Sequence, residues 1–210
     1  MKRFNPYLVL SALLVAGCWL GLFVGPADLS PGDVLVALRP RGEDDIARRI
    51  VLGLRLPRVV AAVFVGASLS VSGAVFQALL RNPLAEPYLL GVSSGAALAV
   101  VCAIALGIGA MGGLVLPLVA LAGGLAAISI VFSVARVSDR LDTRVLILAG
   151  VVVSAFFGAC ITLVLVLSPA ETLRSAFFWT LGSLSGISWN MNAVLVAYAL
   201  PATVAAWGLG

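Results

Sequence analysis

The sequence contains no histidine, and its acidic residues are few. Without an imidazole, the chain offers no histidine general base, no histidine-ligated zinc and no histidine axial ligand for haem. The three cysteines, Cys18, Cys102 and Cys160, each lie alone in an apolar stretch, so neither a disulfide framework nor a metal-ligand spacing is indicated. We therefore expect no cofactor and no metal centre built from side chains of this chain.

Charge is scarce throughout. Charged residues make up 10% of the sequence, whereas about a quarter of residues are charged in an ordinary globular protein, and 62% of the residues are hydrophobic. The basic residues lie in loops and at the N-terminus and form no stripe interleaved with aromatics, so nucleic-acid binding is not supported. An intramembrane enzyme is disfavoured because no acid and no histidine falls inside a long apolar run. The composition predicts an all-α integral membrane protein.

Long uncharged runs locate the membrane spans. Val59 to Leu80 contains no charge and, at about 1.5 Å per residue, is long enough to cross roughly 30 Å of hydrocarbon. Tyr88 to Ala135 is uncharged over a length that suits two crossings, with glycines from Gly107 to Gly113 marking the turn between them. We predict one transmembrane domain over residues 1–210 with about six spans, at 7–25, 57–80, 88–107, 114–136, 145–167 and 191–208.

The first apolar run allows more than one interpretation. Lys2 and Arg3 precede it, as in a signal peptide, and Val15 to Cys18 resembles a lipoprotein cleavage box. The residues after Cys18 stay apolar, however, whereas a lipoprotein becomes polar after its anchor. A retained first span is the interpretation that we adopt.

Two connections are predicted to carry helices of their own. In the polar segment 26–56, Ser30-Pro31-Gly32-Asp33 followed by an apolar run indicates a short surface helix. The stretch 168–190 is too aromatic for a plain loop, and its tryptophans suit a short interfacial or re-entrant helix.

Small residues recur at every fourth position in three spans, which places them on single helical stripes where a neighbouring helix can approach closely. The stripes consist of Ala62, Gly66, Ser70, Ala74 and Ala78; of Gly91, Gly95, Ala99, Ala103 and Gly107; and of Gly150, Ser154, Gly158 and Thr162.

The ordered motifs RLPR at Arg55 to Arg58 and VGASLSVSGAVFQALLRNPLAEPYLLGVSSGAA at Val65 to Ala97 resemble the FecCD-type permeases. These are the membrane subunits of bacterial ABC importers for vitamin B12, haem and iron-siderophore complexes. RLDTRVLILAGV from Arg140 and FFWTLGSLSG from Phe177 also resemble that family's later motifs. The family has about ten spans, so a chain with six is expected to be an incomplete, N-terminal portion of that fold.

The resemblance implies a function and a set of partners. The chain would be a permease subunit that imports an iron-siderophore, haem or cobalamin by alternating access, and any metal cargo would travel inside its chelate. It would lie in the bacterial inner membrane with its N-terminus inside and segment 26–56 in the periplasm. Its partners would be a periplasmic substrate-binding protein, a separate cytoplasmic ABC ATPase that hydrolyses ATP, a second permease copy and membrane lipid. The alternative is a non-transporting structural or assembly membrane protein, including an inactive permease fragment.

Arg55 and Arg58 are the candidate docking residues. Three apart at a helix entrance, they are expected to project toward solvent, where guanidinium groups suit carboxylates. The resemblance implies that they grip acidic residues of the binding protein. The alternative is that both anchor the span at the membrane interface.

The resemblance also implies a cytoplasmic gate at two turns, formed by Asn82 and Leu84 and by Asp142 and Thr143. Neutral polar side chains there can close a path without holding a passing ligand strongly. Alternatively, Asn82 and Asp142 cap helix ends. Gln77, a polar residue within an apolar span, either bonds a neighbouring helix or lines the pathway.

Overall fold

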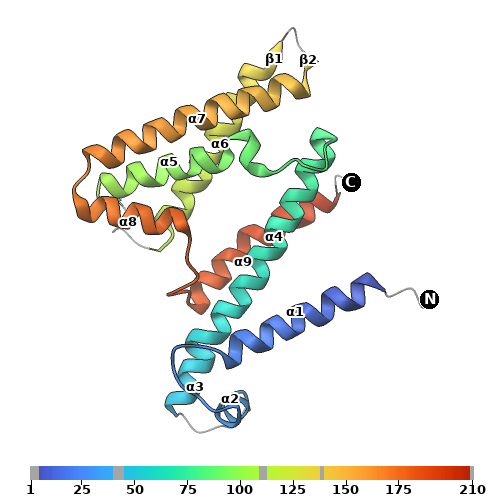
Figure 1. The fold of residues 1–210 in the computed structure, drawn as a ribbon, viewed down its shortest axis with the longest axis vertical. Coiled ribbons are helices and arrows are strands. Elements are labelled where there is room, and N and C mark those ends of the chain that lie inside the picture. Colours follow the sequence, from blue (N-terminus) through green and yellow to red (C-terminus); the bar gives the residue numbers. More distant parts are fainter. Residues whose placement is uncertain (1–4, 40–44, 109–112, 138–139, 209–210) are drawn as a thin grey trace. The chain divides into compact units, whose positions relative to one another are not determined.

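The computed structural model describes residues 5–39, 45–108, 113–137 and 140–208, and nearly all of them are helical (Figure 1). The chain divides into two compact units, residues 1–69 with 184–210 and residues 70–183. The elements are α1 (Pro6–Phe23), α2 (Pro31–Ala37), α3 (Ile46–Ile50), the π-helix η1 (Val51–Arg55), α4 (Leu56–Leu80), the 3₁₀ helix η2 (Pro87–Leu90), α5 (Val92–Ala105), α6 (Val115–Ala135), α7 (Thr143–Leu167), α8 (Ala170–Leu181) and α9 (Trp189–Gly208).

Four helical stretches among the described residues are long and apolar enough to cross a membrane: Pro6–Phe23, Ile46–Leu80, Val115–Ala135 and Arg144–Leu167. The helix α5 is apolar but shorter, at 14 residues. The helical prediction is confirmed, with one exception among the described residues: β1 (Arg136–Val137) pairs antiparallel with β2 (Arg140–Leu141).

In the first unit, the predicted surface helix is confirmed as α2. Ser30 caps it through a reciprocal capping box with Asp33, and Pro31 occupies the first turn. Its apolar face joins a small core formed by Leu22, Val34, Ala37 and Val51. This core fixes α2 against the end of α1 and the start of the next helical stretch.

That next stretch begins earlier than predicted. We expected a polar segment up to residue 56 and a span from about 57, because the proline and the two arginines of RLPR resemble a helix start. Instead Asp45 caps α3 through its side chain, and α3, η1 and α4 form one continuous helix, Ile46–Leu80. The π-helical turn η1 directly precedes Pro57, whose ring would clash with the carbonyl of residue 53 in an unbroken α-helix.

In the second unit, α5, α6 and α7 lie side by side (Figure 1). The contact between α5 and α6 is very close: a Cβ built on Gly95 would lie 2.4 Å from Ala127 Cβ, and one on Gly123 would lie 2.6 Å from Gly95 O. The predicted stripe on α5 therefore packs a helix at this crossing.

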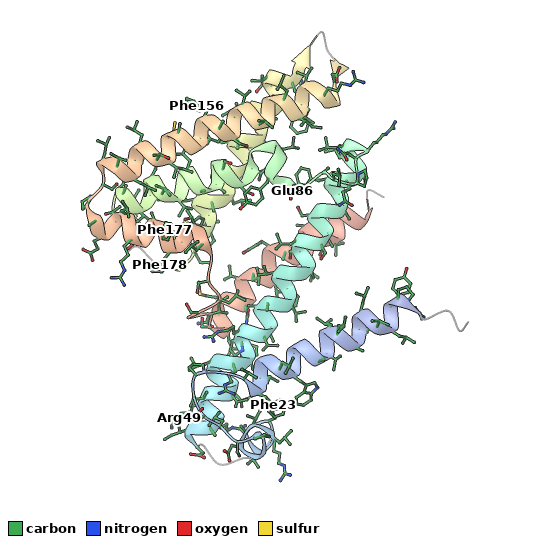
Figure 2. The ribbon with its side chains drawn as sticks, viewed as in Figure 1. Phe23, Arg49, Glu86, Phe156, Phe177 and Phe178 are labelled. Carbon is green, nitrogen blue, oxygen red and sulfur yellow. The ribbon has the colours of Figure 1, made fainter. Side chains whose placement is uncertain are left out.

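The stretch 168–190 contains a helix, as predicted. It is α8, and it begins directly after Pro169. Figure 2 shows Phe177 and Phe178 on α8, and both side chains are more than half exposed. Arg174 Cζ lies 5.7 Å from the centre of the Phe178 ring, a cation–π contact on the same helix.

Candidate functional site

Arg55 is buried, which contradicts the expectation that it projects toward solvent. Only 5% of its surface is exposed. Its guanidinium donates hydrogen bonds to the carbonyl oxygens of residues 22, 23 and 27, at the end of α1 and just beyond. Burial occurs because Arg55 ends the π-helical turn and the chain after α1 folds back over it.

Arg58, three residues later, is exposed. Its Nε–H donates to Leu184 O at 3.3 Å. It also lines an apolar groove of about 450 Å³ between α1 and α4, which includes Cys18, Val59 and Ala62. The expectation of solvent exposure is thus confirmed for Arg58 and wrong for Arg55.

The start of α4 is joined to the start of α9 through two backbone carbonyls. In the π-helical turn, Leu56 N–H donates to Val51 O, five residues back. The next acceptor in that pattern is Leu52 O, but its donor would be residue 57, a proline without an N–H. Trp189 Nε1–H donates to Leu52 O instead, at 2.9 Å. The buried Asn192 Nδ2 donates to Pro57 O at 2.8 Å.

We expect Trp189→Phe to lower the free energy of unfolding by about 1 kcal/mol, because it removes the side-chain donor to Leu52 O. Denaturation in mixed micelles followed by circular dichroism measures this. In a Pro57→Ala background, an N–H at residue 57 can supply Leu52 O, so the same substitution should cost less there. Equal costs in the two backgrounds would contradict this role of Trp189.

The first predicted gate turn is held by Asn82. Its Oδ1 accepts the Leu84 N–H at 2.9 Å, and its own N–H donates to Gln77 O at 3.1 Å. The residue before it, Arg81, adopts a left-handed conformation with φ of 48°. Leu84 at the tip of the turn is 83% exposed. Asn82 thus satisfies a backbone donor within the turn rather than at a helix end, and the turn presents an apolar side chain.

The second predicted gate turn is held by Asp142, which caps α7. Its Oδ1 accepts the Arg144 N–H at 2.8 Å, and its carbonyl accepts the Leu146 N–H. Thr143 is the first residue of α7, and its side chain lies outside the described part of the structure. The capping interpretation is thus confirmed for Asp142.

One apolar cluster brings the two turns to the same end of the second unit. Ala85, in the first turn, and Leu146, near the start of α7, belong to a buried cluster that also includes Leu80, Leu90, Val131, Ala135 and Ala149. The exposed Leu84 and the capping residue Asp142 therefore both lie beside the same buried apolar cluster.

Gln77 is exposed on α4, and within the described residues its side chain makes no hydrogen bond, so the predicted helix-to-helix bond is not seen. Trp189 and Asn192 are structurally important residues that sequence reasoning missed. An amide in an apolar helix was a usable signal for Asn192, but its acceptor could not be inferred. Among the described residues, no cluster of three acidic, cysteine or histidine side chains could hold a metal ion.

Comparison with known proteins supports the sequence resemblance. The vitamin B12 import system permease protein BtuC of Escherichia coli (strain K12 / DH10B) is 40% identical over 190 residues, which cover 90% of this chain and 55% of that protein. BtuC of Salmonella paratyphi A gives the same values. A solved structure described as an inward-facing conformation of a metal-chelate type ABC transporter matches with a TM-score of 0.72 and 30% identity, over 90% of this chain and 57% of that one.

These comparisons confirm the predicted fold class, an α-helical membrane permease fold. The chain spans about half the length of the curated relatives it matches. A model of the FecCD transport family matches residues 13–210, and the chain therefore belongs to that family.

Proposed function

We propose that the chain is a transmembrane permease subunit of an ATP-driven importer and contributes to an alternating-access pathway for a corrinoid or metal chelate. The observation that carries this proposal is the family match over residues 13–210. The identity of 40% to vitamin B12 import permeases favours cobalamin over an iron-siderophore or haem as cargo. It also favours transport over the non-transporting alternative.

In this proposal the subunit lies in the bacterial inner membrane with its N-terminus inside. It works with a second permease copy and with a separate cytoplasmic ATPase, which hydrolyses the ATP. A periplasmic binding protein delivers the cargo to the outer face of the first unit. Arg58 supports that assignment, because it is exposed near the start of α4, where a guanidinium suits a carboxylate of a partner.

At the inner side, the turns of Asn82 and Leu84 and of Asp142 and Thr143 form part of the gate. Two observations support this proposal: both turns adjoin the same buried apolar cluster, and Leu84 in the first turn is exposed. An apolar side chain at a constriction blocks water and ions without binding the cargo. Gln77, exposed on α4, contributes a neutral polar group to the pathway.

The test is capture of a cobalamin-loaded periplasmic binding protein by the chain in nanodiscs. We expect Arg58→Glu to raise the dissociation constant about 30-fold, roughly 2 kcal/mol, because a charge pair becomes a repulsion. Arg174→Glu is the matched control, since Arg174 is an exposed arginine that contacts an aromatic ring of its own helix. It should leave binding unchanged.

The same assay separates the cargo classes. A binding protein loaded with cobalamin should be captured in preference to one loaded with a ferric siderophore or haem. If the intact chain captures none of these proteins and no ATPase, the importer proposal is wrong, and the non-transporting alternative is favoured.

A further inference from the structure

The guanidinium of Arg55 lies among backbone carbonyls and makes no ion pair within the described residues. Nη1 donates to Leu22 O at 2.7 Å and to Phe23 O at 2.9 Å, and Nη2 donates to Ala27 O at 2.6 Å. Leu22 and Phe23, the latter labelled in Figure 2, are the last two residues of α1.

The carbonyls at the end of a helix have no partner within the helix and carry the negative end of its dipole. A buried cation that donates to several of them satisfies both the carbonyls and itself. Arg55 therefore caps α1 from 32 and 33 residues further along the chain.

The chain after α1 is shaped to fit this side chain. A Cβ built on Gly25 would lie 3.0 Å from both Nε and Nη2 of Arg55 and 3.1 Å from its Cζ. Any side chain at residue 25 would therefore press on the guanidinium. Arg55, as the last residue of the π-helical turn, faces this backbone, whereas Arg58 on the following turns is exposed.

We propose that Arg55 is a positioning residue rather than a second docking residue. It fixes residues 22–27 against the start of α4, and thereby keeps the surface beside Arg58 in the conformation that the binding protein binds. The docking part of this inference rests on the proposed function; the attachment of α1 to α4 does not. The positive charge of Arg55 is buried and interacts with backbone carbonyls of the same chain, whereas that of Arg58 is exposed to a partner.

The first test needs no partner. Cys18 is half-buried in the groove between α1 and α4, so its alkylation reports whether the two helices separate. In a chain with Cys102→Ala and Cys160→Ala, we expect Arg55→Gln and Gly25→Val each to speed alkylation of Cys18 by N-ethylmaleimide about tenfold, since local opening becomes easier when hydrogen bonds to a charged group are lost. Arg174→Gln, at an exposed arginine that does not line this groove, should leave the rate unchanged, and Arg55→Lys should have an intermediate rate. An unchanged rate in Arg55→Gln would overturn the proposal.

The second test distinguishes positioning from docking through the salt dependence of binding-protein capture. Arg58→Gln should weaken binding and flatten its dependence on salt, because it removes an intermolecular charge contact. Arg55→Gln and Gly25→Val should weaken binding severalfold while the salt dependence stays that of the unmodified chain. If Arg55→Gln flattens the salt dependence and Gly25→Val binds normally, Arg55 docks the partner and the inference is wrong. Should the unmodified chain capture no binding protein, the proposed function fails, and the Cys18 rates still decide the attachment.

Discussion

Gly95→Ala is expected to lower the free energy of unfolding of the second unit by about 3 kcal/mol, the upper part of the range for overpacking a close contact. The added Cβ would lie 2.4 Å from Ala127 Cβ and 2.8 Å from Gly123 O. Both atoms belong to or adjoin the backbone of α6, so neither can rotate away. The two helices must separate, and the contacts along their whole crossing weaken.

Gly158→Ala is the matched control, because it makes the same change within a helix where a Cβ would meet nothing within 4 Å. It should be neutral or stabilising by up to about 1 kcal/mol, since alanine favours the helix. Ala127→Gly in the Gly95→Ala chain should recover part of the loss. Mixed-micelle denaturation followed by circular dichroism measures the free energy of unfolding of the unmodified chain, the two single variants and the double variant. Equal effects of Gly95→Ala and Gly158→Ala would show that the α5–α6 contact is looser than described.

Gly91→Ala should also cost about 3 kcal/mol, for two reasons that add. Gly91 has φ of 73°, a left-handed conformation that costs an alanine about 1–2 kcal/mol. A Cβ there would also lie 3.2 Å from Ser154 Oγ and 3.6 Å from Gly150 O, both on α7, and this crowding contributes about 1 kcal/mol more. Gly91 separates η2 from α5, so the strain falls between the gate turn and the α5–α6 contact.

Gly107→Ala separates the two contributions. Gly107 has φ of 75°, but a Cβ there would meet nothing within 4 Å. Its substitution should therefore cost only the conformational part, about 1–2 kcal/mol. The same denaturation assay compares the two variants. If they cost the same, the crowding against α7 is absent, and the position of Gly91 beside Ser154 is wrong.

Most helices could be predicted because uncharged runs and local caps depend on nearby residues alone. The helix start at Ser30-Pro31-Gly32-Asp33 and a helix within residues 168–190 were predicted from a few residues each. The start of the second long helix was missed because Pro57 locally indicates a helix beginning. A π-helical turn and a distant Trp189 make the proline compatible with a helix interior, and neither is encoded nearby.

The small-residue stripes show how far a pattern can be interpreted. On α5 the stripe contacts α6 at Gly95, and Gly91 faces α7. On α4 the same spacing gives exposed Ala74 and Ala78, and a Cβ on Gly66 would meet open space. Spacing identifies a face that allows close approach, but the partner of that face is a property of the tertiary structure.

The candidate sites divide in the same way. The capping role of Asp142 and the turn bond of Asn82 both follow from local chemistry, and helix capping had been considered for both residues. The common cluster beneath the two gate turns, and the difference between Arg55 and Arg58, depend on residues far away in the sequence. A spacing of three on a helix predicts neighbouring faces, but it does not predict that the chain after α1 covers one of them.

A charge-reversal cycle tests most directly whether Arg58 contacts the binding protein and whether Arg55 instead stabilises the chain's own structure. Arg58→Glu and Arg55→Glu chains would each be measured against the cobalamin-loaded binding protein and against variants in which its surface acidic residues are changed singly to lysine. We expect one such lysine variant to restore binding to the Arg58→Glu chain and none to restore binding to the Arg55→Glu chain. Restoration of Arg55→Glu alone, or of neither chain, would contradict this assignment.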